Sequence, residues 1–266
     1  MIITAVVCFS ITGLILGIIL SIAGRYFNVK VDLREEKILD SLPGINCGAC
    51  GYPGCGAYAA AIIEKKEELT KCIPGGNETA EKLGLIMGIQ AGRMEKRVAR
   101  VFCNGGRDKS PERFIYSGIS SCTAVNITGG GNKACVYGCL GLGDCMRSCP
   151  FDAIVMRDDA IPHIDEEKCT SCGKCVIACP RQLIDIIPKD KKVIVACKSR
   201  DTGAEVRKNC TVGCTACKLC VKACSSQAIT VEDNLACIHP STCTLQKACI
   251  PTCPRHTIIE YPKTIS

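Results

Sequence analysis

The sequence has no tryptophan, and aromatic residues make up only 4% of its 266 positions. Aromatic side chains bury large apolar areas, so a chain this poor in them is not expected to be held together by large apolar cores. It also lacks the G-x-G-x-x-G frame of dinucleotide-binding loops and the Lys-Ser/Thr that ends a P-loop. We therefore interpret the glycine run "TGGGN" at 128–132 as a turn and expect no nucleotide site on this chain.

Catalytic signatures are missing as well. The sequence has only three histidines, which are far apart and lie in loop-like contexts: His163, His239 and His256. We expect them on the surface or in hydrogen bonds rather than as ligands. No pattern indicates a nucleophile with a neighbouring base, so we predict no catalytic residues.

The formal net charge of +7 would suit a protein that binds nucleic acid, but two observations argue against this. The basic residues are spread along the chain instead of forming one stripe. The formal count also treats every cysteine as neutral. If about 24 cysteines held about six metal clusters of roughly −2 each, the loaded protein would lie near about −5. We interpret the basic balance as an offset to cofactor charge and expect no nucleic-acid partner.

What the chain has in abundance is cysteine, with 25 residues, about a tenth of the sequence. In a short secreted protein that density would predict disulfides. Here most cysteines are two or three residues from the next, a spacing that suits a shared metal centre better than separate bridges. Metal centres would then supply much of the stability that small cores cannot.

An uncharged apolar stretch opens the chain. It spans 22 residues, 2–23, which is long enough to cross a bilayer as a helix. Arg25, Lys30 and Arg34 follow it, and the positive-inside rule then places the rest of the chain in the cytoplasm. A cleaved signal peptide would have a basic residue before the apolar stretch, and none is present. We predict a retained single-pass anchor over residues 1–24, with Cys8 inside it.

The first group of cysteines lies in a glycine-rich segment, "GINCGACGYPGC", and an alanine-rich helix carries the chain on to a fourth. Glycines let the backbone wrap closely round an inorganic core. Four thiols also suit zinc, but three close thiols plus a distant one, in a chain with ferredoxin-type motifs, favour a [4Fe–4S] cluster. The expected ligands are Cys47, Cys50, Cys55 and Cys72.

From residue 135 onward a cysteine motif occurs four times, each followed by a similar tail such as "CPFDAI" or "CPRQLI". The third cysteines of the motifs are spaced by 30, 45 and 29 residues, which predicts two tandem ferredoxin-like modules. In two-cluster ferredoxins the fourth cysteine of each run ligates the other cluster. The two motifs with all their cysteines predict two sets: Cys169, Cys172, Cys175 with Cys149, and Cys214, Cys217, Cys220 with Cys253.

The other two motifs lack the second cysteine, which is replaced by Leu142 in "CVYGCLGLGDCMRSCP" and by Gln246 in "CTLQKACIPTCP". An amide is a hard, neutral ligand and a poor substitute for a thiolate on iron. Each of these motifs has an extra cysteine just upstream, which we expect to supply the missing sulfur. The alternative is a three-iron cluster beside an idle thiol. The expected sets are Cys135, Cys139, Cys145 with Cys179, and Cys237, Cys243, Cys249 with Cys224.

Apart from Cys8, four cysteines remain after these five sets: Cys103, Cys122, Cys197 and Cys210. Four is the number that a sixth cluster needs. Ordinary buried thiols are common, however, and the long separations give no geometric support. We expect [4Fe–4S] clusters at five sites, and a sixth stays open.

Together these features predict an α+β protein. It has a single N-terminal transmembrane helix, a small helical [4Fe–4S] domain and two tandem bacterial-type 2[4Fe–4S] ferredoxin-like modules. The expected parts are an anchor (1–24), the helical cluster domain (25–90), a connector with extra cysteines (91–134), the first module (135–196) and the second module (197–266).

This order of motifs resembles the B subunits of Rnf ion-translocating electron-transport complexes, in the long form with two ferredoxin modules. The resemblance runs from the anchor through "GINCGACGYPGC" and "CVYGCLGLGDCMRSCPFDAI" to the tandem modules. The chain departs from the motif at Gln246, with Cys237 upstream, and at Ser225, where a proline is usual.

The resemblance implies a membrane-anchored cytoplasmic subunit that accepts electrons from soluble ferredoxin, or returns them. It would relay them through [4Fe–4S] clusters to other membrane subunits of a ferredoxin:NAD oxidoreductase that pumps Na⁺ or H⁺. Two alternatives stay open. One is a polyferredoxin subunit of another membrane redox complex, such as a hydrogenase, and the other is a zinc-stabilised docking protein.

Overall fold

A computed structural model describes residues 2–26 and 32–261 of the chain. The first element is a long helix, α1 (Ile2–Tyr26), in which the window Val6–Gly24 has a mean hydropathy of 2.6 and no buried residue. It is long and apolar enough to cross a membrane, as the sequence predicts. Lys30, one of the basic residues expected to follow the anchor, lies outside the described residues.

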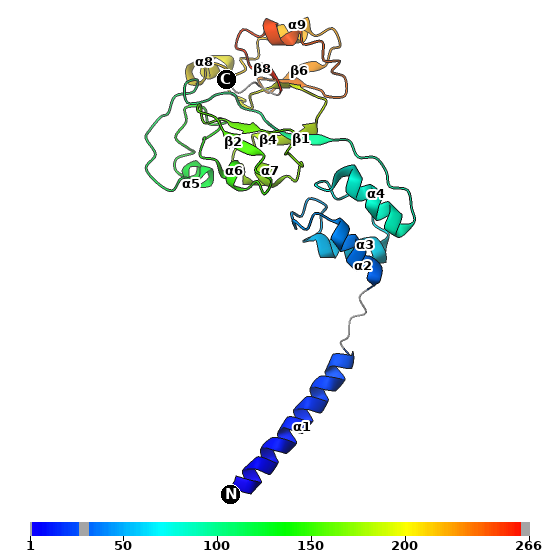
Figure 1. Cartoon of the computed structure of the whole chain (residues 1–266). Coiled ribbons are helices and arrows are strands. Elements are labelled where there is room, and N and C mark those ends of the chain that lie inside the picture. The colour runs from blue at the N-terminus through cyan, green and yellow to red at the C-terminus, as the bar shows by residue number, and fades with distance from the viewer. Residues whose placement is uncertain (1, 27–31, 262–266) are drawn as a thin grey trace.

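A small helical domain comes next (Figure 1). It contains α2 (Leu33–Ser41), α3 (Cys55–Lys65) and α4 (Gly76–Met87). Asp32 caps α2 by accepting a hydrogen bond from the Arg34 N–H at 2.9 Å, and the left-handed Gly88 ends α4. The apolar faces of these helices meet in one small core around Ile38, Tyr58 and other buried residues.

The segment predicted to form the first module, together with one strand from the expected connector before it, contains two antiparallel strand pairs and two short helices. Strand β2 (Ile154–Met156) pairs with β3 (Pro162–Ile164), and β1 (Arg97–Val101) pairs with β4 (Ile184–Pro188). The helices are α6 (Asp144–Arg147) and α7 (Lys174–Ala178). Strand β1 lies in the segment expected to be a connector, and four of its five residues are buried because it completes the module's core.

The second module repeats this plan. Strand β6 (Ile229–Glu232) pairs with β7 (Leu235–Ile238), and β5 (Val193–Val195) pairs with β8 (Ile258–Glu260). Its helices are α9 (Leu219–Ala223) and α10 (Cys249–Thr252). Two further short helices, α5 (Cys122–Ile127) and α8 (Gly203–Asn209), lie outside the repeat.

The two modules are joined by contacts between β1 and the end of the chain. The Tyr261 hydroxyl donates to the Val101 carbonyl at 3.2 Å, and the fully buried Arg100 lies over the Tyr261 ring at 4.5 Å from its centroid. Arg100 also pairs with Glu166 at 2.5 Å, so its charge is compensated. In Figure 1 the small domain, the first module and the second module follow one another away from α1.

Candidate cluster-binding sites

The two complete motifs share a backbone conformation that aims their cysteines inward. In the first module Ser171 and Gly173, which flank the second cysteine, have φ values of 53° and 81°. In the second module Ala216 and Lys218 have φ values of 55° and 59°. Left-handed residues between ligands curl the chain and turn successive N–H groups to one side, a concave arrangement suited to an anion.

The first expected set comes together in the small domain. Burial, with smaller contributions from the nearby thiols of Cys55, Cys50 and Cys47, raises the pKa of Cys72 to about 11. The loop is shaped by a side chain, because the Asn46 amide oxygen accepts a hydrogen bond from the Cys55 N–H at 2.8 Å. All four expected thiols are therefore neighbours.

The two sets with regular spacing also come together, each with the fourth cysteine of the other motif. Burial, with smaller contributions from nearby thiols that include Cys149, raises the pKa of Cys175 to about 12. The Ala99 N–H donates to Cys169 Sγ at 3.4 Å, as expected for a backbone around a thiolate. In the second module one cavity is lined by Cys214, Cys217, Cys220 and Cys253.

The first irregular motif keeps the same loop but obtains its fourth thiol from an unexpected place. Gly141 and Gly143 have φ values of 74° and 78°, so Leu142 stands where the second ligand would be. One cavity is lined by four thiols: Cys122, Cys139, Cys145 and Cys179. Cys122 thus occupies the place expected for Cys135.

Asp144 holds the helix that carries Cys122 against this motif. Its carboxylate accepts hydrogen bonds from the Ser121 hydroxyl at 2.9 Å and from the Thr123 N–H at 3.1 Å. Burial alone would raise the pKa of Asp144, but these donors and the Arg147 charge keep it below its usual value. The anchored α5 begins at Cys122 and presents its thiol to the cavity.

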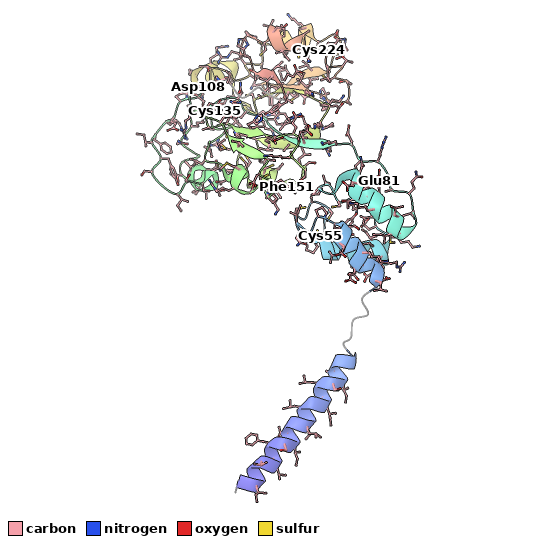
Figure 2. The ribbon with its side chains drawn as sticks, in the orientation of Figure 1. Cys55, Glu81, Asp108, Cys135, Phe151 and Cys224 are labelled. Carbon is pink, nitrogen blue, oxygen red and sulfur yellow. The ribbon has the colours of Figure 1, made fainter. Side chains whose placement is uncertain are left out.

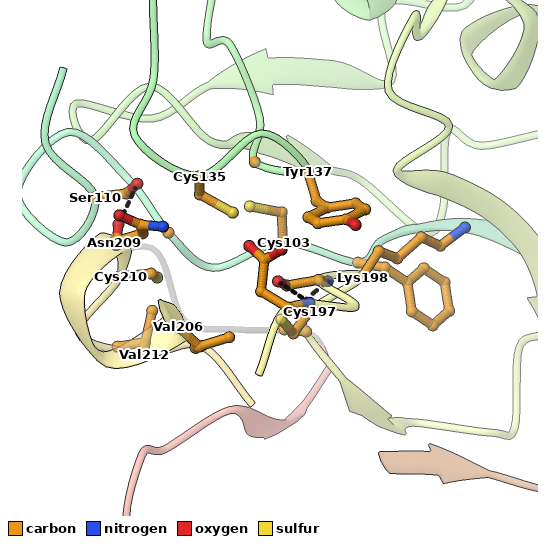
Figure 3. Close-up of a pocket in the computed structure, with 17 residues that line it drawn as sticks. Cys103, Ser110, Cys135, Tyr137, Cys197, Lys198, Val206, Asn209, Cys210 and Val212 are labelled. Carbon is orange, nitrogen blue, oxygen red and sulfur yellow. Dashed lines mark hydrogen bonds between the residues drawn. The ribbon is translucent and has the colours of Figure 1, made fainter. Parts of the chain in front are cut away.

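Cys135 joins three of the leftover cysteines in another cavity. The four thiols that line it are Cys103, Cys135, Cys197 and Cys210. Figure 3 shows Cys103 and Cys135 pointing toward each other across it. A Cβ added to Gly105 would lie only 3.1 Å from Cys210 Sγ, so glycine keeps this wall open. This is the open sixth set with Cys135 in place of Cys122.

The cavity of Cys103, Cys135, Cys197 and Cys210, here named the bridging site, has N–H donors and positive charge at its edge. The N–H groups of Cys139 and Ser199 each donate to a thiol of the set, Cys103 Sγ and Cys197 Sγ, at 3.4 Å. Burial raises the pKa of Cys210, while the charges of Lys133 and Arg255 act to lower it. These cations would offset the negative charge of a bound cluster.

The last motif has the regular loop but only three thiols. Leu245 and Lys247 have φ values of 58° and 60°, so Gln246 stands at the second ligand position. The cavity there is lined by Cys224, Cys243 and Cys249, together with Gln246. Cys237, the expected fourth ligand, does not line it.

The reason is the alternation of side chains along β7. Ala236 and Ile238 pack in the apolar core of the second module, to which several of the cluster-site thiols also belong, and Cys237 is not part of that core. Because successive residues of a strand point to opposite faces, Cys237 lies on the other face of β7, in a groove that Arg200 and Cys243 also line. The position of a cysteine just upstream of a motif in the sequence does not by itself indicate which way its thiol points.

The thiols are spread round cavities instead of converging on one point. Within residues 2–26 and 32–261, no three His, Cys, Asp or Glu side chains are grouped as a single metal ion would require. Zinc would need its sulfurs at about 2.3 Å from one ion. The wider arrangement, the inward N–H groups and the open glycine walls fit polynuclear iron–sulfur clusters better than zinc.

Comparison with protein families agrees with this chemistry at two places. Residues 42–74 match the FeS family, which is described as an Fe–S cluster family. Residues 161–184 match the Fer4_6 family, described as a 4Fe–4S binding domain. The first match spans the four thiols of the small domain, and the second spans the complete motif of the first module.

Three curated relatives match nearly the whole chain, and each is the B subunit of an ion-translocating complex. That of the Na⁺-translocating ferredoxin:NAD⁺ oxidoreductase complex of Acetobacterium woodii is 47% identical over 95% of this chain and 77% of its own length. Its proton-translocating counterpart in Clostridium ljungdahlii is 42% identical over 97% and 92%. That of the ion-translocating oxidoreductase complex of Methanosarcina acetivorans is 36% identical over 92% and 93%.

Proposed function

This chain belongs to the B-subunit family of Rnf-type ion-translocating ferredoxin:NAD⁺ oxidoreductase complexes, as an electron-transfer iron–sulfur subunit, and we propose that it relays electrons along a single row of six cluster sites. The row runs from the far end of the second module to the small domain beside the anchor. When bound, each cluster takes up and gives back one electron at a time. The chain's own residues set the order of the sites and the distances between them.

Contacts between neighbouring sets support the first part of the row. Burial raises the pKa of Cys172, and the thiols of Cys47 and Cys149 raise it further, so the small domain's site adjoins the Cys172 set. Cys145 is in turn among the thiols that raise the pKa of Cys175 to about 12, after burial. The two sets of the first module are therefore neighbours.

The bridging site supports the connection between the modules. The Cys139 N–H donates to Cys103 Sγ at 3.4 Å, which places the Cys139 set beside it. On its other side, burial raises the pKa of Cys197 to about 12, against the opposing effect of a backbone hydrogen bond from Cys214, and the Cys103 thiol is close enough to contribute to the rise. Cys103 belongs to the core of the first module and Cys197 packs against that of the second. This single site in contact with both modules is the observation that carries the proposal.

The last step lies inside the second module. Burial raises the pKa of Cys249, and thiols of two sets, Cys243 of its own and Cys253 of the next, add to it. Figure 2 marks Cys55, Cys135 and Cys224 in the small domain, near the junction of the modules and in the outer module. The six sets thus support one unbranched row with the Cys224 set at its outer end.

The ends of the row support a direction for the partners. The small domain directly follows the segment after α1, so its site is the one tethered nearest a membrane, beside other membrane subunits. Soluble ferredoxin would exchange electrons at the outer module. An anchored chain keeps its inner site near membrane partners at a high effective concentration. The reducing cytoplasm suits so many free thiols.

The experiment is to break the row at the bridging site. In the anaerobically purified full chain, Cys210→Ser should lower the iron content by about four or fewer of about 24 per chain. Reduced ferredoxin should still reduce the outer module within the wild-type time, while clusters beyond the break should be reduced at least about tenfold more slowly. Stopped-flow absorbance and freeze-quench EPR measure both.

The matched control is Cys8→Ser, which removes an exposed thiol of α1 that lines no cluster cavity. It should leave iron content and both rates unchanged. Uniformly fast reduction of all remaining clusters in Cys210→Ser would contradict the single row. A colourless protein that contains zinc and is not bleached by dithionite would contradict electron transfer altogether.

A further inference from the structure

The outermost site has three thiols where each of the other five has four, although its loop has the same backbone conformation. Leu245 and Lys247 have the left-handed φ values found in the complete motifs, so the backbone presents Gln246 as it would present a ligand. The cavity nevertheless holds only the thiols of Cys224, Cys243 and Cys249. The residues do not fit a cluster with four thiolates.

No other thiol of the described chain is available to this cavity. Cys237 is fixed by the pairing of β7 with β6, where it lies opposite Thr230, and its Sγ lies 4.0 Å from the Leu235 carbonyl on its own strand. To reach the cavity it would have to cross to the other face of the sheet. Cys253 lies close enough to contribute to the raised pKa of Cys249, but it lines the cavity of the Cys214 set.

Gln246 is a poor replacement for the missing thiolate. Its neutral amide is a hard ligand, and iron in such clusters is held by soft thiolates. The amide is also engaged elsewhere, because its oxygen accepts a hydrogen bond from the Ser225 hydroxyl. Both residues are exposed, so the corner of the cavity without a thiol faces solvent.

The two residues at which this chain departs from the regular motifs, Ser225 and Gln246, are therefore linked by a hydrogen bond at one site. Ser225 stands where Pro150, Pro180 and Pro254 follow the last cysteine of the other motifs, and Gln246 stands where a cysteine is usual. A proline could not offer the hydroxyl that Ser225 donates to Gln246. Together they place a hydrogen-bonded polar pair, with no sulfur, where the fourth ligand of the cluster would be.

We propose that the site of Cys224, Cys243 and Cys249 holds its cluster through three thiolates and has one exchangeable iron at the corner beside Gln246. This rests on the proposed function, since it assumes that the thiol sets bind clusters. An outer-sphere oxidant such as ferricyanide would remove one electron from the oxidised four-iron core of charge +2. One Fe²⁺ would leave, a three-iron core of charge +1 would remain, and ferricyanide would become ferrocyanide. Fe²⁺ plus one electron from dithionite reverses the step.

The consequence for the row is that its outer end is the part most sensitive to oxidation. Each of the other five sets groups four thiols, enough to hold all four irons of a cluster, and the outer cavity has three. Exposure to an oxidant would then alter the site that receives electrons first. The remaining sites would stay intact and could be used again once Fe²⁺ and a reductant return.

The test uses the full-length loaded chain and counts spins. After mild ferricyanide treatment, wild type should show the EPR signal of an oxidised three-iron cluster at about one spin per chain. Incubation with ⁵⁷Fe²⁺ and dithionite should then insert about one ⁵⁷Fe per chain, seen by Mössbauer spectroscopy. Gln246→Cys should reduce both readouts at least about tenfold, because a fourth thiolate would retain the iron.

Three further variants make the result decisive. Gln246→Ala and Cys237→Ala should keep the wild-type signal, since neither residue holds iron in this proposal. Leu142→Cys, at the matched position of the other irregular motif, should also keep it, because Cys122 already completes that site.

Loss of the cluster in Cys237→Ala, or of the signal in Gln246→Ala, would overturn the proposal by identifying a fourth ligand. So would a wild-type chain with full iron and no exchangeable corner. A chain without any clusters would overturn the proposed function as well, so the two failures can be told apart.

Discussion

The two irregular motifs start from the same defect and end differently. Both have lost the second cysteine, and both keep left-handed residues on either side of the gap, Gly141 and Gly143 in one and Leu245 and Lys247 in the other. In the first module the side chain of Cys122 fills the gap from a remote helix. In the second module no thiol fills it within the described chain, and Gln246 lines the cavity.

One residue accounts for much of this difference. Asp144 directly precedes the third cysteine of the first irregular motif and holds α5 through the Ser121 hydroxyl and the Thr123 N–H. The corresponding residue of the last motif is Ala248, which has no side-chain acceptor. The motif's spacing therefore specifies its loop, while recruitment of a distant ligand needs both a helix that brings a thiol to the cavity and a neighbouring carboxylate that holds this helix.

The largest effect that would sharpen this comparison is expected from Cys122→Ser. It should remove the fourth thiolate from a site in the middle of the row, so that site loses about one to four irons and electron flow beyond it falls at least about tenfold. Iron and sulfide determination and stopped-flow reduction by ferredoxin measure these losses. Cys237→Ser is the matched control and should leave both unchanged.

A second substitution tests the cause of that loss. Adding Leu142→Cys to Cys122→Ser rebuilds the regular spacing on a loop that already has the required φ values, so the double variant should recover the four-iron site. EPR distinguishes the four-iron from the three-iron form. If Cys122→Ser alone keeps a normal cluster, Cys122 is not the ligand and the contrast between the two motifs disappears.

Local patterns in the sequence account for the features that depend on residues close together in the chain. The apolar run predicts α1, the glycine-rich cysteine cluster predicts the small domain's site, and the motif repeat predicts two modules of paired short strands. These features depend on residues close together in the chain, where spacing fixes geometry. The structure brings the thiols of those three regular sets together as expected.

The remaining assignments depend on tertiary contacts that spacing cannot encode. Cys122 and Cys135 exchange their expected places because Asp144 fixes α5 over one cavity while Cys135 faces the other. Cys237 lies on the wrong face of β7. The sequence did contain one signal for the orientation of Cys237. In a strand over "LACI", Cys237 and the apolar Ile238 are successive residues, so their side chains point to opposite faces.

A moderate effect is expected from Asp144→Ala, which makes the first irregular motif resemble the last. Loss of the acceptor for Ser121 and Thr123 should free α5 at a cost of about 1–3 kcal/mol, so Cys122 is held less firmly. Chelator should bleach this site several times faster, and a second three-iron EPR signal should appear on oxidation. Ala248→Asp is the matched control and should change nothing, since no further thiol of the described residues lines that cavity for a carboxylate to hold in place. An unchanged bleaching rate in Asp144→Ala would show that α5 is positioned by other contacts.

The smallest effect is expected from Ser225→Pro, which restores the proline of the other motifs at the last site. The change removes the hydroxyl that donates to the Gln246 amide. Both side chains are exposed, so the free energy of unfolding should change by no more than about 0.5 kcal/mol. The three-iron EPR signal should stay at about one spin per chain, because neither the hydroxyl nor the amide holds iron. Ser225→Ala, which removes the same hydroxyl without constraining the backbone, should behave identically. If both variants lost the exchangeable iron, the Ser225–Gln246 pair would be required for iron exchange at this site. The last motif would then differ from the first by this pair as well as by its missing fourth thiol.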